Sequence, residues 1–184
     1  DYTVRLTTNK ESKEQPLVVR KDPRWQYTDE DLMAQFELEK AVRDSLTAVH
    51  DLIRSIRDLK DQARSITERS EKTNYGADLK QPCTALVEKL NALEEDLIQT
   101  RNESSQDPIN YPVKLDNQFS YLYTVVHSQD ARPTEGSYQR FEDLNVEMAE
   151  KRKAFQQILD NELSNFEKIM KEQGVPRVII SSLR

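Results

Sequence analysis

Apolar and polar residues alternate at the start of the chain and then change to a helical spacing. In residues 2–7 every second side chain is apolar, which is typical of a β-strand that buries one face. We expect residues 9–15 to form a turn and residues 16–20 to return as a second strand. Pro23 is expected to end this strand, because proline has no amide hydrogen to donate to a neighbouring strand. The pattern predicts a short β-hairpin over residues 1–24.

A long helix is predicted to follow, because apolar residues recur every three or four positions as far as about residue 69. Thr28 is expected to cap its N-terminus, with Asp31 at the position that completes a capping box. Roughly 40 helical residues extend over about 60 Å. Three pairs of opposite charge are expected on its outer face: Glu39–Arg43, Arg54–Asp58 and Arg57–Asp61. Its apolar stripe comprises Leu32, Phe36, Val42, Leu46, Val49, Ile53, Ile56, Leu59, Ala63 and Ile66.

Three further helices are indicated by the same spacing. The second follows the turn at residues 74–76, with Asp78 as a candidate cap and Pro82 in or near the first turn. The third is short and follows Pro112. The fourth is predicted from about residue 137 to 173 and ends at Gly174, a residue that readily adopts the left-handed conformation. Their apolar seams are Leu79, Cys83, Leu86, Leu90, Leu93 and Leu97; Leu115, Phe119, Leu122 and Val126; and Phe141, Leu144, Met148, Phe155, Leu159, Leu163, Phe166 and Met170.

These segments predict a mainly α-helical fold, an up-down-up-down four-helix bundle with two long outer helices, preceded by the hairpin. The hairpin would occupy residues 1–24, the bundle residues 25–174 and a C-terminal tail residues 175–184. Because the first and fourth helices are the longest, we expect their shared end to project from the bundle. The hairpin and the apolar residues 178–180 of the tail would pack there.

Composition narrows the classes of function. The chain has 33 acidic and 27 basic residues, well mixed, with a net charge of −6. This balance lacks the basic patch of a nucleic-acid-binding protein. No apolar run approaches the roughly 20 residues that cross a bilayer, so no membrane insertion is expected. A single cysteine excludes a disulfide within this sequence, and leaves the redox compartment open.

Candidate catalytic and metal-binding side chains are few. The Glu-x-x-His pattern of di-iron bundles is absent, because Thr47 precedes His50 by three positions and Thr124 precedes His127. Each histidine lies beside an apolar seam residue, which favours packing at the edge of the core. One cysteine and two distant histidines offer too few ligands for a structural zinc site.

Acidic runs occur at residues 29–31 and 94–96, and Glu147 pairs with Glu150. We interpret them as helix starts and solvated outer faces rather than a catalytic pair of carboxyls. Cys83 lies in a leucine seam, where a small buried hydrophobe fits. We therefore predict no catalytic, cofactor-binding or metal-binding residue, no cofactor and no enzymatic activity.

Tyrosines flank the short third helix, in the segments 110–112 and 121–123. Tyrosine favours half-buried contacts with one polar end in water. Two interpretations stay open: these tyrosines lock the short helix onto its longer neighbours, or they form a contact surface for another domain.

Several stretches resemble the C-terminal region of large exported bacterial proteins that carry BNR-repeat, sortilin (VPS10)-like β-propellers and are often labelled glycosyl-hydrolase-like. Residues 2–6 and 15–24 resemble the final hairpin of their Ig-like domain, although residues 9–13 replace the expected tight glycine-containing turn. The resemblance implies export to the periplasm, cell surface or medium and a propeller upstream, and it carries over no catalytic residue. The helical stretches that resemble this family are residues 31–36, 110–115, 121–123 and 132–136.

The expected function is a non-catalytic C-terminal helical module of such a protein, providing structural support or a protein-docking surface. Its partners would be the upstream domains of its own parent chain, and another protein is a further candidate. The alternative is a free-standing helical adaptor that binds a partner through its long helices. An independent enzyme ranks third.

Overall fold

The computed structural model describes residues 1–24, 26–71, 76–101, 103–104, 106–107 and 110–175, with the backbone alone at 76–78. In this part of the chain four helices follow a two-stranded antiparallel hairpin, and two of the helices are long, with 43 and 38 residues. The predicted fold class, mainly α-helical after a hairpin, is confirmed. The helices are α1 (Asp29–Glu71), α2 (Gly76–Leu97), α3 (Leu115–His127) and a fourth formed by α4 (Glu135–Ile158), the π-helical turn η2 (Leu159–Leu163) and α5 (Ser164–Glu172).

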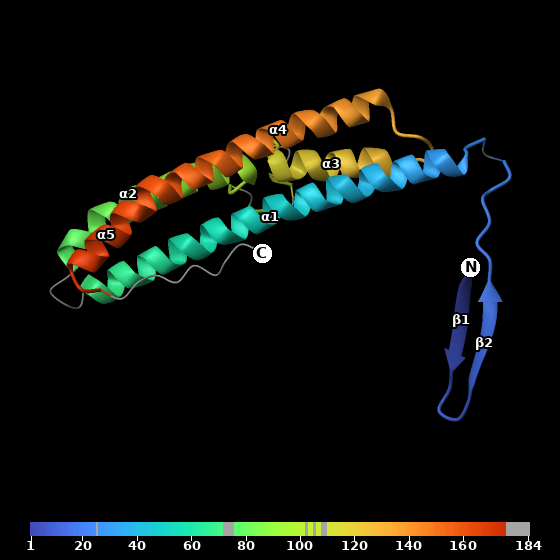
Figure 1. The fold of residues 1–184 in the computed structure, drawn as a ribbon, viewed down its shortest axis with the longest axis horizontal. Coiled ribbons are helices and arrows are strands. Elements are labelled where there is room, and N and C mark those ends of the chain that lie inside the picture. The colour runs from blue at the N-terminus through green and yellow to red at the C-terminus, as the bar shows by residue number, and fades with distance from the viewer. Residues whose placement is uncertain (25, 72–75, 102, 105, 108–109, 176–184) are drawn as a thin grey trace.

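The helices form three rows, because α2 and α3 lie one after the other along α1 (Figure 1). Lys60 in the second half of α1 donates to Asn91 of α2, with 2.9 Å between Nζ and Oδ1. Gln35 near the start of α1 instead donates to the end of α3, with 2.9 Å between Nε2 and the Val126 carbonyl oxygen. The fourth helix runs parallel to α1, and Ser45 contacts Asn145 across the two rows.

This path differs from a simple up-down-up-down order, since α3 continues in the direction of α2. Length explains the difference: α2 and α3 have 22 and 13 residues against 43 in α1, or roughly 33 and 20 Å against about 65 Å. Together they make one row. As a result, α5 ends at the opposite end of the bundle from the hairpin (Figure 1). The fourth helix therefore does not end beside the hairpin as expected, and residues 178–180, which were predicted to pack there, lie outside the described residues.

The hairpin pairs β1 (Tyr2–Thr7) with β2 (Ser12–Leu17), and Tyr2 lies opposite Leu17. The turn is shorter than predicted, because the Thr8 amide already donates to the Glu11 carbonyl oxygen over 2.8 Å. The polar residues 12–15 belong to the returning strand, where Glu14 pairs with Arg5. The strand ends at Leu17, so Pro23 does not end it. Among the described residues neither strand contacts a helix.

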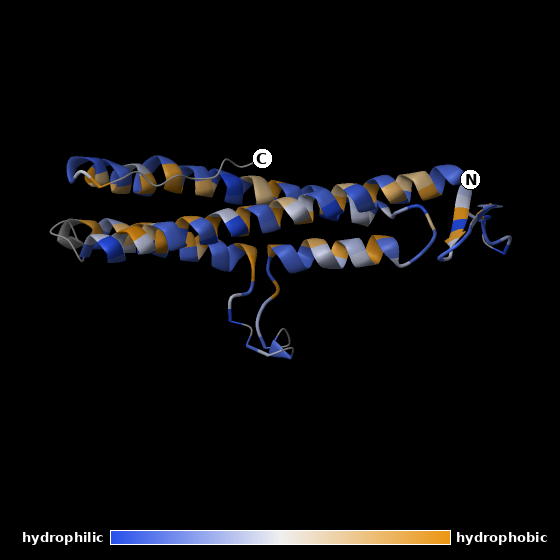
Figure 2. Cartoon of the chain, turned by 90° about the horizontal axis from the view of Figure 1, so that it is seen from below, coloured by the Kyte–Doolittle hydropathy of each residue, from blue (hydrophilic) through white to orange (hydrophobic). Residues whose placement is uncertain are grey.

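The predicted seams form most of the core. The seam of α2 is buried along its whole length, and so is that of α3. At the start of α1 the prediction is wrong in phase: Phe36 is 56% exposed, and Gln35 takes the buried position. Hydrophilic and hydrophobic residues alternate in bands along the helices (Figure 2).

Helix starts follow their predicted chemistry at α1. The Asp31 amide donates to Thr28 Oγ1 over 3.1 Å, and the Thr28 amide donates to Asp31 Oδ2 over 2.9 Å, which completes the capping box. The predicted cap of α2, Asp78, has a side chain outside the described residues. Pro82 lies inside α2, in its second turn.

The long fourth helix contains a π-helical turn that the sequence did not reveal. Between Ile158 and Leu163, both buried, the step is five residues instead of three or four. A π turn adds one residue to the helix and so returns the later apolar residues to the core-facing side. Leu159, predicted to lie in the seam, is half-buried beside it.

Candidate functional site

The two histidines lie at separate points of the contact between α1 and α3. His127 Nδ1 is 3.2 Å from Glu39 Oε1, and its ring stacks on Tyr123 with 5.7 Å between the centroids. His50 is half-buried and its charge acts on Asp116. Among the described residues, no group of three or more histidine, cysteine or acidic side chains is arranged to hold a metal ion. Cys83 is buried in the α2 seam, as predicted.

One acidic run departs from the prediction. Glu94 was expected on a solvated outer face, but it is 5% exposed and faces α1. It accepts hydrogen bonds from Lys60, itself buried, and from Arg57, whose Nε lies 2.6 Å from Glu94 Oε1. Asp61 was the i,i+4 partner predicted for Arg57, but Arg57 pairs with Glu94 of the neighbouring helix α2 instead. The expected pairs at Arg43 and Arg54 are also replaced, by Asp44 and Asp51.

Two opposing influences set the pKa of Glu94. Burial is the larger single influence and would raise the pKa, because it disfavours the charged carboxylate. The hydrogen bonds and charges of Lys60 and Arg57 together outweigh it, so the pKa lies below the ordinary glutamate value. Glu94 is thus held as a carboxylate by two cations of α1, and Lys60 also donates to Asn91, so this cluster links α1 and α2 at a defined register.

The contact of α3 with α1 depends on a buried glutamine. Gln35 is 6% exposed, and its Nε2 donates to the carbonyl oxygens of Val126, at 2.9 Å, and Gln129, at 2.7 Å. The last carbonyls of a helix lack partners within the helix, so Gln35 satisfies the C-terminal end of α3. The signal in the sequence was its spacing, since Gln35, Leu38 and Val42 are separated by three and four positions.

A second buried carboxyl lies at the start of α3. Asp116 is 9% exposed, and its Oδ1 accepts the Asn117 amide over 2.7 Å. Burial raises the pKa of Asp116, and the amide and the charge of His50 oppose this only in part. Asp116 is thus a buried acid held by a backbone amide rather than by a cation.

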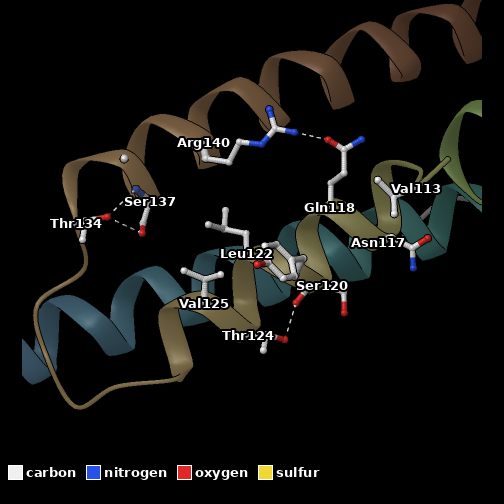
Figure 3. Close-up of a pocket in the computed structure, with 12 residues that line it drawn as sticks. Val113, Asn117, Gln118, Ser120, Leu122, Thr124, Val125, Thr134, Ser137 and Arg140 are labelled. Atoms are coloured by element: carbon white, nitrogen blue, oxygen red, sulfur yellow. Dashed lines mark hydrogen bonds between the residues drawn. The ribbon is translucent and has the colours of Figure 1, made fainter. Parts of the chain in front are cut away.

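A groove of about 900 Å³ runs between α3 and the first half of α4 (Figure 3). One side comes from an outward row of α3 and the segment before it, and the other from the start of α4. Three apolar side chains in it are well exposed: Val113 by 61%, Tyr121 by 72% and Val125 by 44%. The lining residues are Val113, Asn117, Gln118, Ser120, Tyr121, Leu122, Thr124, Val125, Thr134, Gly136, Ser137 and Arg140.

This groove has a mainly apolar lining with little charge. Its lining contains no histidine, cysteine or carboxylate, and its single charged group is Arg140, which donates to Gln118 Oε1. The two tyrosines of α3 have different surroundings. Tyr123 is half-buried against the core and stacks on His127, whereas Tyr121 lines the groove. Tyr123 therefore matches the locking interpretation, and Tyr121 matches the contact-surface interpretation.

The hairpin carries a second apolar surface. Cross-strand neighbours share a face, so Tyr2, Val4 and Leu6 lie on the same side as Leu17, which is opposite Tyr2. The same side also carries Gln15, opposite Val4, and Lys13, opposite Leu6. All four apolar side chains are between 47% and 69% exposed. The other face holds the Arg5–Glu14 ion pair and a hydrogen bond between the hydroxyls of Thr7 and Ser12. We call the first side the apolar hairpin face.

Comparison with family models, curated proteins and solved structures finds no match for this chain. Within the described residues, no helix combines the length and the apolar character needed to cross a bilayer.

Proposed function

We propose that this chain is a non-catalytic helical module that supports a larger protein and docks onto its other domains. The observation that carries this proposal is the apolar hairpin face, whose four large side chains are all exposed. A two-stranded hairpin is marginally stable by itself in water, and a partner sheet over this face would supply the missing burial. The face opposite is polar and internally paired, so docking would occur on one side only.

The composition of the bundle interior also supports this proposal. Its core is built from apolar seams and from one ionised cluster between α1 and α2. In the described part, Arg57, Lys60 and Glu94 form an ion-paired cluster, Asp31 caps α1 and His127 contacts Glu39 at the surface. Such structural roles are typical of a scaffold. Catalysis or carbohydrate recognition by the parent would then belong to its other domains.

The resemblance to exported propeller proteins gives the proposal its concrete form. In that form the hairpin completes the sheet of an Ig-like domain of the same polypeptide, and the parent protein is exported to the periplasm, the cell surface or the medium. The bundle would extend from that sheet, attached through residues 18–28.

The first test is the denatured intact mass of the native polypeptide that contains the Trp25 segment, taken from its source. We expect a mass several times the 21.5 kDa of this chain. A mass near 21.5 kDa would contradict the parent protein and favour the alternative, a free-standing adaptor.

A second test addresses the hairpin in the native polypeptide. Val4→Asp places a charge on the apolar hairpin face, whereas Thr3→Asp places the same charge on the polar face. We expect Val4→Asp alone to release the hairpin and to speed limited proteolysis of residues 8–24. Equal proteolysis of both variants would show that no domain covers this face.

The adaptor alternative is favoured by a different observation, the apolar groove between α3 and α4. It predicts that the isolated chain binds a separate protein, or associates with itself through its long helices as its concentration rises. Sedimentation of the 184-residue chain over a range of concentrations distinguishes self-association from a monomeric module.

A further inference from the structure

We infer that the groove between α3 and α4 binds an amphipathic helix of a partner protein, with an acidic side chain of that helix opposite Arg140. This inference deepens the proposed docking function, yet it uses a surface of the bundle rather than the hairpin. The partner would add a fourth row to the half of the bundle that contains α3.

The direction and length of the groove favour a helical occupant. Asn117, Tyr121 and Val125 follow one another at steps of four along α3, over roughly 12 Å. Val113 extends this row beyond the start of the helix. A helix of about three turns lying along α3 would cover the row and meet α4 on its other side. The volume of about 900 Å³ accommodates several apolar side chains of such a helix.

The walls also disfavour an extended strand. A β-strand binds by pairing its backbone with the unpaired edge of a sheet. The groove is walled mainly by α3 and α4, whose backbone groups are already paired within each helix except near the ends. Recognition must therefore use side chains, and an amphipathic helix presents them as a stripe at i, i+3, i+4 and i+7.

Charge complementarity defines the polar part of the partner. The chain as a whole has a net charge of −6, but the groove lining contains no acidic residue and one arginine. Arg140 is exposed and takes part in none of the ion pairs of the described residues, and Gln118, its hydrogen-bond partner, is neutral. A carboxylate on the partner helix could accept a charge-assisted hydrogen bond from the guanidinium.

The test is a selection from a displayed library of helical peptides of about 18 residues, roughly 27 Å long, using the full 184-residue chain as bait. Selected peptides are synthesised with a fluorescent label and titrated by anisotropy. Val125→Asp places a charge inside the groove. Val146→Asp is the matched control, because Val146 is 63% exposed on α4 and does not line the groove.

We expect the enriched peptides to share an apolar helical stripe and an acidic residue beside it. Val125→Asp should weaken their binding by about tenfold or more, equivalent to about 1.4 kcal/mol, whereas Val146→Asp should change it by less than about twofold. Arg140→Glu should weaken the binding of the acidic peptides. The same variant should bind more tightly to versions of these peptides in which lysine replaces the acidic residue. Tyr121→Ala gives a second groove variant at an exposed position, should Val125→Asp disturb folding as judged by circular dichroism.

Three outcomes would overturn the inference. One is that no helical peptide is enriched, and another is that the groove variants bind as tightly as the Val146→Asp control. The third is a dimer of the chain that Val125→Asp abolishes, which would assign the groove to a second copy. Binding of the peptides by the Val4→Asp chain separates the two proposals, because this variant tests the hairpin and leaves the groove intact.

Discussion

The half of the bundle that contains α2 and the half that contains α3 each bury one carboxyl group, and they hold it in opposite ways. Glu94 and Asp116 are 5% and 9% exposed. Lys60 and Arg57 hold the pKa of Glu94 below its ordinary value, whereas burial raises the pKa of Asp116. Similar depth thus gives opposite shifts, because only Glu94 has cations within hydrogen-bond distance.

This difference extends to the way in which α2 and α3 are each attached to α1. In the α2 half, a continuous leucine seam and an ionised cluster fix one register between α1 and α2. In the α3 half, the shorter helix is attached by a glutamine cap, an exposed histidine contact and four seam residues. The same half contains the open groove. We therefore expect the α2 half to be the more stable of the two.

The largest expected effect comes from breaking the ionised cluster. Glu94→Ala leaves the Lys60 ammonium buried without its carboxylate, and we expect a loss of about 3–5 kcal/mol in the free energy of unfolding. Urea denaturation measures this loss. Glu95→Ala is the control, because Glu95 is the exposed neighbour and should change stability by less than about 0.5 kcal/mol.

The same cluster gives a pH dependence with a definite sign. The pKa of Glu94 is lowered in the folded chain, so its contribution is fully present above the unfolded glutamate pKa of about 4.3. It is lost as the pH falls through the lower folded value, because the unfolded state takes up the proton first. A Lys60→Met, Glu94→Leu double variant should lose less stability over this acidic range, and an unchanged acid dependence would contradict the role of the cluster.

The next effect concerns the attachment of α3. Gln35→Ala removes the side-chain donor to the Val126 carbonyl oxygen and one of two donors to that of Gln129, which keeps the Ala131 amide. The expected cost is about 1–3 kcal/mol. Hydrogen exchange should show faster opening of the α3 amides than of the α2 amides. Gln139→Ala, at an exposed position of α4, is the control. Equal acceleration in both halves would show that α3 does not open separately.

A smaller effect is expected at the histidine contact. His127→Ala removes an exposed contact with Glu39 and a stacked ring on Tyr123. Exposed ion pairs contribute about 0.2–1 kcal/mol, so the urea midpoint should fall only slightly. If His127→Ala lost as much stability as Glu94→Ala, the attachment of α3 to α1 would not differ from that of α2 in the way described.

The smallest expected effect has the opposite sign. Asp116→Asn removes a buried acid that has no cation within hydrogen-bond distance, so the variant should be slightly more stable at pH 7. The gain is reduced by the lost interaction of the acid with the helix N-terminus, worth about 0.3–1 kcal/mol. Because the folded pKa is raised, the gain should shrink as the pH falls and Asp116 itself becomes protonated. A gain that persists at acidic pH would assign it to another cause.

The parts of the fold that follow apolar spacing could be predicted from the sequence. The α2 seam, the α3 seam and the Thr28–Asp31 capping box are confirmed because each depends on residues close together in the chain. The side-by-side order of the helices was harder, because it depends on comparing the lengths of α2 and α3 with that of α1. The π turn was missed because Ile158 and Leu159 are both apolar, so a step of four and a step of five fit equally well.

The candidate sites depend on residues far apart in the sequence. Glu94 and Lys60 each follow a buried leucine, and nothing local distinguishes them from the exposed charges beside them. The role of Gln35 was not predicted, because its acceptors lie about 90 positions later. Predicting the groove would have required the angle between α3 and α4, which the sequence does not give. The spacing of four positions shows only that Tyr121 and Val125 lie on one side of α3. The predicted parent protein and its export remain predictions.

The rate at which Cys83 reacts with a thiol reagent can report how often the α2 half opens. Cys83 is the only thiol in the sequence, and it lies 6% exposed within the α2 seam. A thiol reagent can reach its sulfur only when α2 separates from its neighbours, so the labelling rate counts these openings. Detachment of α3 alone is expected to leave that rate unchanged, which would make this cysteine a selective reporter of openings in the α2 half.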